Sequence, residues 1–118
     1  LLDNSDVSIL DFHSTPWEET RRIHPDFFLH KERSDIREIK AKGVFDVIYF
    51  DAFSPDIQPE LWSPEVFKKI ADLTASGGIL TTYSVKGDIK RALIAAGFSV
   101  EKIPGPYGKR VILRAIKN

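Results

Sequence analysis

The chain has 118 residues, 42% hydrophobic and 29% charged, which suits one globular domain and excludes a disordered or collagen-like chain. Without cysteine it forms neither disulfides nor thiolate metal sites, so a cytoplasmic protein is expected, and no apolar run approaches the roughly 20 residues that cross a bilayer. The net charge of zero hides an acidic first part, with 9 Lys and Arg against 15 Asp and Glu in residues 1–85, and a basic remainder, with 8 against 2.

The predicted elements alternate between strands and helices after a less clear start. In chain order they are a strand at 27–31, a helix at 34–42, a central strand at 44–51, a helix at 63–75, a strand at 78–84, a helix at 86–97 and final strands at 98–103 and 109–116. Within the first 26 residues, 7–12 are compatible with a strand and 16–23 with an irregular or helical connection. The sequence contains no internal repeat and no low-complexity segment.

Two of the helices have clear boundary signals. At residues 63–75, Ser63 can serve as the N-cap and Pro64 suits the first helical position, where its missing N–H costs nothing. The helix at 86–97 ends on Gly97, the residue type that most readily adopts the left-handed conformation of a C-cap.

Alternating strands and helices indicate an α/β fold with a mostly parallel sheet covered on both faces. The last two strands are joined by a short Pro/Gly turn, so they are expected to pair antiparallel as a hairpin. A sheet that ends in such a hairpin is similar to the C-terminal half of the Rossmann-like class I methyltransferases. Fold alone does not establish function.

Ligands of open α/β sheets lie beyond the carboxyl ends of the strands. Asp51 and Tyr83 occupy such positions, and Asp35 follows another strand, so these side chains are expected to converge on one cleft beside the aromatic residues Phe53 and Trp62. The alternatives remain open for each: Asp35 as a helix N-cap, Trp62 as a hydrophobic staple and Tyr83 as an ordinary sheet residue.

Asp51 is the strongest candidate among them. It ends an apolar run, and an ionised carboxylate in apolar surroundings is costly unless it is paired or binds a ligand. The basic last third of the chain is a second candidate site, either for RNA phosphates or as an ordinary solvated surface.

Several motifs together resemble the methyltransferase domain of the bacterial MnmC proteins, especially the stand-alone forms without the flavin-dependent oxidase half. They are FDAFSP, PELW, GGILTTYS, the glycine-ended helix followed by GF, and PGPYGKR. The resemblance is close over roughly residues 44 to 113 and looser at PWEE and IHPDFFLHKERSDI.

The resemblance implies an S-adenosyl-L-methionine-dependent transferase that methylates the aminomethyl group of a tRNA wobble uridine. A cofactor role is implied for Asp35 at the adenine amino group, for Ile36 against the adenine ring, and for Asp51, Ala52 and Phe53 at the reacting end. Asp51 would also face the reacting amine as the catalytic residue. A separate enzyme that makes the aminomethyl substrate is an implied partner.

The substrate side follows from the same resemblance. Phe53 and Pro55 would shape the substrate pocket, and Phe53, Trp62 or Tyr83 could stack an extruded uracil, since enzymes that modify a base take it out of its stack. The residues expected at tRNA phosphates are Lys86, Lys90, Arg91, Lys109 and Arg110.

One part of the methyltransferase pattern is missing from this sequence. No glycines group as a G-x-G loop that opens a helix, so residues 1–118 are interpreted as a single partial domain without the glycine-rich cofactor loop, and weak cofactor binding is expected.

Other functions remain possible from the residues alone. The alternatives are a non-catalytic RNA-binding module and a small-molecule amine methyltransferase. A metal site is not expected, because His13, His24 and His30 lack ligand spacing, and the pair of Asp51 and Asp56 is only a faint hint of one.

Overall fold

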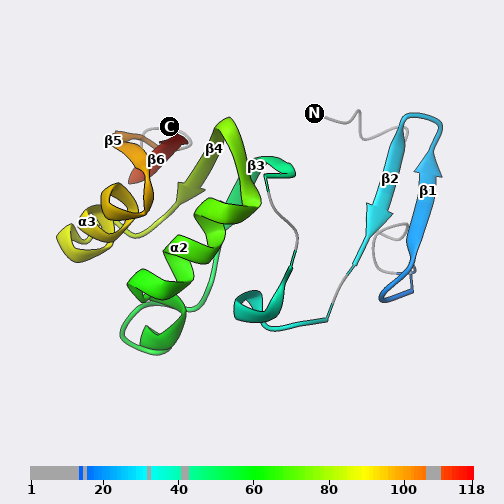
Figure 1. The fold of residues 1–118 in the computed structure, drawn as a ribbon, viewed down its shortest axis with the longest axis horizontal. Coiled ribbons are helices and arrows are strands. Elements are labelled where there is room, and N and C mark those ends of the chain that lie inside the picture. The colour runs from blue at the N-terminus through cyan, green and yellow to red at the C-terminus, as the bar shows by residue number, and fades with distance from the viewer. Residues whose placement is uncertain (1–13, 15, 32, 41–42, 106–109) are drawn as a thin grey trace. The chain divides into compact units, whose positions relative to one another are not determined.

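The computed structural model describes residues 14, 16–31, 33–40, 43–105 and 110–118. The chain divides into two compact units, Leu1–Asp35 and Ile36–Asn118 (Figure 1). The strand predicted at residues 7–12 lies outside the described residues.

The N-terminal unit contains an antiparallel hairpin of β1 (Thr20–His24) and β2 (Phe27–His30). Its turn is the dipeptide at 25–26, and its register places Arg22 opposite Phe28. The strand predicted at 27–31 is confirmed, whereas the irregular or helical connection predicted at 16–23 is wrong from Thr20 onward, where β1 begins. Because β2 pairs with β1, it does not add a parallel strand to the main sheet.

The second unit is built on a four-stranded sheet in the order β3-β4-β6-β5. Its strands are β3 (Phe45–Phe50), β4 (Thr74–Thr82), β5 (Phe98–Pro104) and β6 (Val111–Lys117). β3 and β4 pair in parallel, while β6 runs antiparallel to both β4 and β5. The predicted C-terminal hairpin is therefore confirmed. The mostly parallel sheet is wrong, because the returning strand β6 inserts between β4 and β5 and makes the sheet mixed.

Two helices pack together on one face of this sheet, α2 (Pro64–Leu73) and α3 (Gly87–Ala96) (Figure 1). The predicted caps are confirmed: the Ser63 side chain accepts a hydrogen bond of 3.3 Å from the backbone N–H of Val66, and Gly97 ends α3 with φ 109°. α2 ends earlier than expected, at Leu73, because Thr74 already has extended backbone and begins β4.

Short 3-10 helices replace one of the predicted elements. η1 (Ile36–Glu38) is the only helical turn among the described residues of the segment 34–42, so the α-helix predicted there is wrong. Ile36 packs against the core, but no residue of η1 is completely buried, and so short a segment is not stable as an α-helix. A second 3-10 helix, η2 (Pro59–Trp62), leads into α2.

The core lies between the two helices and one face of the sheet. Its fully buried members include Phe67 and Ile70 from α2, Leu93 from α3, and Leu80 and Leu113 from the sheet. β3 was expected to be a central strand, but within the described residues it pairs on one side only, and Phe45, Val47 and Tyr49 are exposed on it.

Candidate functional site

The carboxyl ends of β3 and β4 lie side by side because these strands pair in parallel. Tyr49 pairs with Thr81, and Phe50 pairs with Thr82. Asp51 follows β3 directly and Tyr83 follows β4, so the strand-end rule has brought the predicted carboxylate and phenol to one edge of the sheet.

A shallow pocket of about 220 Å³ opens at this edge. Its lining residues are Tyr49, Phe50, Asp51, Thr81, Thr82, Tyr83 and Ile112. The pocket combines one carboxylate with aromatic rings and threonines, a set that suits a small cationic or amphipathic group.

Asp51 is solvent-exposed in this pocket rather than enclosed by apolar side chains. The desolvation cost expected from its position after an apolar run is therefore absent, because water reaches the carboxylate. Asp51 lines the pocket and, within the described part of the chain, has no ion pair with a competing cation.

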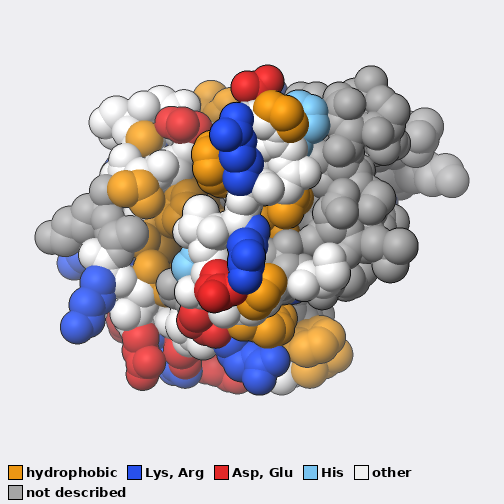
Figure 2. Space-filling view, turned by 90° about the vertical axis from the view of Figure 1, so that its right-hand side faces the viewer, with side chains coloured by type: hydrophobic (Ala, Val, Ile, Leu, Met, Phe, Trp, Pro, Cys, Tyr) orange, Lys and Arg blue, Asp and Glu red, His pale blue; other side chains and the backbone are white. Residues whose placement is uncertain are grey.

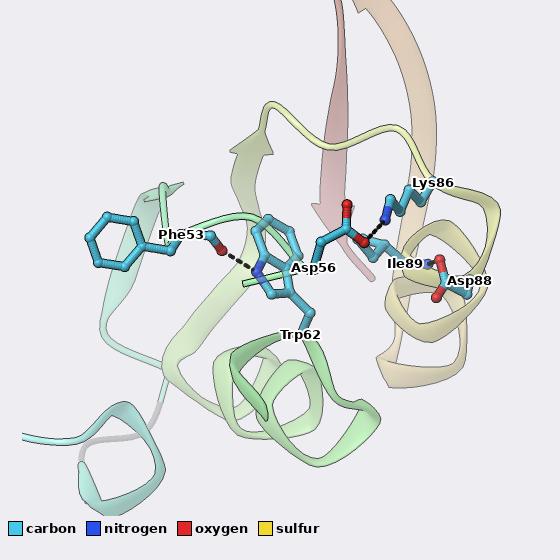
Figure 3. Close-up of polar contacts among 6 residues, drawn as sticks. All are labelled: Phe53, Asp56, Trp62, Lys86, Asp88 and Ile89. Carbon is cyan, nitrogen blue, oxygen red and sulfur yellow. Dashed lines mark hydrogen bonds and ion pairs between the residues drawn. The ribbon is translucent and has the colours of Figure 1, made fainter. Parts of the chain in front are cut away.

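The loop after Asp51 is held at two consecutive carbonyl groups. The Tyr83 hydroxyl donates a hydrogen bond of 2.8 Å to the carbonyl oxygen of Ala52. Trp62 Nε1 donates one of 2.7 Å to the carbonyl oxygen of Phe53 (Figure 3). The Phe53 ring itself remains 71% exposed. Two anchors on the backbone thus fix the start of the loop and leave this ring open to a ligand.

Trp62 has a different position from the one that base stacking requires. It is 6% exposed and makes edge-to-face contacts with Phe50, Phe67 and Tyr83, with ring centroids 4.9, 6.2 and 5.7 Å away. The stacking role predicted for Trp62 does not fit this burial. Its indole instead holds the loop through the hydrogen bond to Phe53 and packs on Phe67 of α2, which resembles the hydrophobic staple considered as the alternative.

The predicted phosphate contacts are spread along the second unit. Lys86 Nζ forms an ion pair of 2.9 Å with Asp56 of the loop (Figure 3). Arg91 and Arg110 are exposed, and Lys90 is half-buried. Lys109 lies outside the described residues. Pro55 is half-buried and belongs to a turn, in which the backbone N–H of Gln58 donates a hydrogen bond of 2.8 Å to the carbonyl oxygen of Ser54.

The predicted adenine contacts do not belong to the pocket of Asp51. Ile36 lines a second, apolar cavity of about 320 Å³ along β3, which shares Tyr49 and Phe50 with the first pocket. Asp35 closes the N-terminal unit, so its approach to the cleft stays a prediction.

Five residues that line the pocket were not predicted from the sequence: Tyr49, Phe50, Thr81, Thr82 and Ile112. Tyr49 precedes Asp51 by two positions on the same strand, and the alternation of strand side chains could have indicated it. Thr82 is 4% exposed, and its Oγ1 has no hydrogen-bond partner among the described residues. No sequence signal marks such a hydroxyl, because its isolation depends on the packing around it.

Two classes of site find no support within the described residues. No three His, Asp or Glu side chains gather there as metal ligands. No helix there is long and apolar enough to span a membrane.

Comparisons with known proteins give a consistent result. Residues 10–118 match the model of a family described as S-adenosyl-L-methionine-dependent methyltransferases. Among curated proteins, the chain is similar to the tRNA 5-methylaminomethyl-2-thiouridine biosynthesis bifunctional proteins MnmC of Burkholderia vietnamiensis, 41% identical over 96% of the chain, and of Aromatoleum aromaticum, 51% identical over 58% of it. The chain spans only 17% and 11% of the lengths of these two relatives.

Solved structures of methyltransferases have a similar fold. MnmC2 from Aquifex aeolicus matches with a TM-score of 0.64 and 27% identity, over 73% of this chain and 30% of the other. The antibiotic-resistance methyltransferase Kmr matches with a TM-score of 0.55 and 12% identity, over 73% of this chain and 56% of the other, which shows similarity of fold alone.

Proposed function

The chain belongs to the S-adenosyl-L-methionine-dependent methyltransferase family, and from this premise we propose that it methylates the aminomethyl group of a tRNA wobble uridine. The product of this reaction on 5-aminomethyl-2-thiouridine is 5-methylaminomethyl-2-thiouridine. The printed names of the MnmC relatives support this substrate. A separate enzyme that makes the aminomethyl group is part of the same proposal.

The observation that carries the proposal is the position of Asp51. It lies where β3 ends, in an open pocket with Tyr49 and Tyr83, and no ion pair occupies it within the described residues. A carboxylate next to aromatic rings suits positive charge, and both the sulfonium of the cofactor and the protonated amine of the substrate are cations. The side chains at this edge therefore fit both reacting groups.

When bound, S-adenosyl-L-methionine would supply a methyl group on a positively charged sulfur; the amine nitrogen would form the new bond to the methyl carbon, and the sulfur would leave with the carbon–sulfur electron pair. The alkylamine is mostly protonated at neutral pH, so it must lose a proton to water before its lone pair can react. Asp51 accepts a charge-assisted hydrogen bond from the ammonium and keeps the neutral amine oriented after the proton leaves.

Orientation is the main contribution expected of this site. Holding the reacting atoms in line contributes up to about 7 to 11 kcal/mol in favourable cases. The exposed ring of Phe53 stacks the extruded uracil, and the anchored carbonyls of Ala52 and Phe53 keep this ring at a fixed distance from Asp51. Lys86 and Arg110 contact phosphates of the tRNA.

Cofactor affinity of the 118-residue polypeptide by itself is proposed to be weak, because its sequence contains no G-x-G loop that opens a helix. Thermal shift with S-adenosyl-L-methionine tests this, with the Aquifex aeolicus MnmC2 protein as the reference. Equal stabilisation of the two proteins would show that the cofactor is held without such a loop.

The function itself is tested by labelled methyl transfer to tRNA from cells that lack this modification. The full-length protein is compared with its Asp51→Asn and Asp51→Ala variants. Incorporation of the methyl group is expected to fall by about tenfold or more in both variants, because neither an amide nor a methyl group carries the negative charge that holds an ammonium. Unchanged incorporation would remove Asp51 from the mechanism.

The same assay separates the alternative functions. Transfer to free alkylamines but not to tRNA would indicate a small-molecule methyltransferase. Binding of tRNA without any transfer in the full-length protein would indicate a non-catalytic RNA-binding module.

A further inference from the structure

The hairpin of the N-terminal unit places three cations over two exposed aromatic rings. Arg22 Cζ lies 5.6 Å from the centre of the Phe28 ring, and Lys31 Nζ and Arg33 Cζ each lie 5.1 Å from that of Trp17. Phe28 is 62% exposed and Trp17 48%. Figure 2 shows blue Lys and Arg side chains next to orange hydrophobic and pale-blue histidine side chains on the face turned to the viewer.

The pair of Arg22 and Phe28 is ordered before any ligand arrives. Arg22 donates from Nε and Nη2 to the carbonyl oxygen of Pro25 at 3.0 and 2.6 Å, which holds the guanidinium at the tip of the hairpin. The register pairs Arg22 with Phe28 and Thr20 with His30, so these four exposed side chains share one face. Thr20 Oγ1 and His30 Nδ1 are 3.1 Å apart and joined by a hydrogen bond.

The second ring is held by a strained backbone. Glu18 has φ 58°, in the left-handed region that a residue with a side chain rarely adopts. The backbone N–H of Glu18 donates a hydrogen bond to the carbonyl oxygen of Lys31, and its carboxylate accepts one of 2.6 Å from the backbone N–H of Arg33. These two bonds hold the strained residue in place, next to Trp17, whose ring lies within reach of both Lys31 and Arg33.

Exposed aromatic rings beside cations suit a ligand that has both flat bases and phosphates. An exposed ring stacks on a base, and a cation beside that ring pairs with the adjoining phosphate. The combination therefore favours a nucleic-acid strand whose bases are not already paired.

We propose that the β1–β2 hairpin binds single-stranded RNA, with bases stacked on Phe28 and Trp17 and phosphates held by Arg22, Lys31 and Arg33. The identity of that RNA as a tRNA loop rests on the proposed function. No residue of the hairpin lines the pocket of Asp51, so the two sites can be tested separately.

The direct test is binding of fluorescently labelled oligouridylate to the full-length protein without cofactor, measured by anisotropy. Phe28→Leu keeps an apolar side chain but loses the ring, and it weakens binding by at least about fivefold, the lower limit for loss of one stacked base. Phe28→Trp retains binding. Ile94→Ala, which removes an exposed apolar side chain from α3, is the matched control and leaves binding unchanged.

Two further readouts distinguish stacking on the hairpin from general attraction. Bound RNA quenches the emission of exposed Trp17, and Trp17→Phe abolishes this quenching while buried Trp62 still emits. Arg22→Gln lowers the slope of log affinity against log salt by about 0.7, as loss of one phosphate contact requires.

Clear results would overturn the proposal. Equal binding of oligouridylate and of an RNA duplex with the same number of phosphates excludes stacking, and so does wild-type affinity in Phe28→Leu. Failed methyl transfer with RNA binding that depends on Phe28 refutes the proposed function and leaves the hairpin site. Methyl transfer at low tRNA concentration that is insensitive to Phe28→Leu refutes the hairpin site and leaves the function.

Discussion

The hydroxyl of Tyr83 donates a hydrogen bond of 2.8 Å to the carbonyl oxygen of Ala52, the residue that directly follows Asp51. The bond joins the ends of two parallel strands across 31 positions of sequence. The carboxylate is thereby connected to the rigid sheet on both sides, by β3 before it and by Tyr83 after it.

Replacing Tyr83 with Phe removes this bond and is expected to lower the free energy of unfolding by about 0.5–1.5 kcal/mol. Methyl transfer should fall further than stability, because the segment after Asp51 loses an anchor. Urea unfolding and the tRNA assay measure the two effects. Tyr49→Phe is the matched control, because it also removes a phenolic hydroxyl group from the pocket. Tyr49 is largely exposed, so the free energy of unfolding of this variant should not change.

Trp62→Phe removes the donor to the Phe53 carbonyl and part of a buried ring system. The expected loss of stability is about 1–3 kcal/mol, since a polar group loses its partner in a half-buried place. Chemical unfolding measures it, and Trp17→Phe provides the comparison because that indole is exposed. Equal losses in the two variants would contradict the anchoring role of Trp62.

Thr82 offers a test with the opposite sign. Its buried Oγ1 has no hydrogen-bond partner among the described residues, so Thr82→Val, which keeps the shape, should leave the melting temperature unchanged or raise it. Thr82→Ser, which keeps the hydroxyl and removes a methyl group, should lower it. A clear fall in Thr82→Val would mean that the hydroxyl is satisfied by a water or a ligand.

The ion pair of Lys86 and Asp56 links the loop to the start of α3. Both side chains are well exposed, so Asp56→Ala should change stability by less than about 1 kcal/mol. If Lys86 contacts phosphate, the same change should tighten tRNA binding at low salt, while Lys86→Ala weakens it. Glu60→Ala removes a nearby negative charge without an ion pair in the described chain and should have the smaller effect on binding.

Elements with local signals could be predicted from the sequence. Ser63, Pro64 and Gly97 specify helix ends through their own backbone and side-chain chemistry, and the Pro/Gly turn specifies the hairpin of β5 and β6. The strand-end rule correctly brought Asp51 and Tyr83 to one pocket. These inferences need only neighbouring residues or a parallel pairing of two strands.

Pairing between distant or ambiguous segments could not be predicted in the same way. β1 reads TRRIH, a charged stretch without apolar alternation, and it becomes a strand because the turn at 25–26 places it against β2. The role of Trp62 was ambiguous for a related reason. The partner of its indole is a backbone carbonyl, and a carbonyl leaves no mark in the sequence.

Among the described residues, β3 pairs with another strand on one side only, and this has a practical consequence for material made from this sequence. Phe45, Val47 and Tyr49 are exposed on this strand, and residues 45–50 contain neither the Lys nor the Pro that usually protects an edge strand. Edge strands of this kind pair with one another between molecules in concentrated solution. Preparations of the 118-residue polypeptide should therefore aggregate and become turbid on standing, and storage at low protein concentration should delay the aggregation.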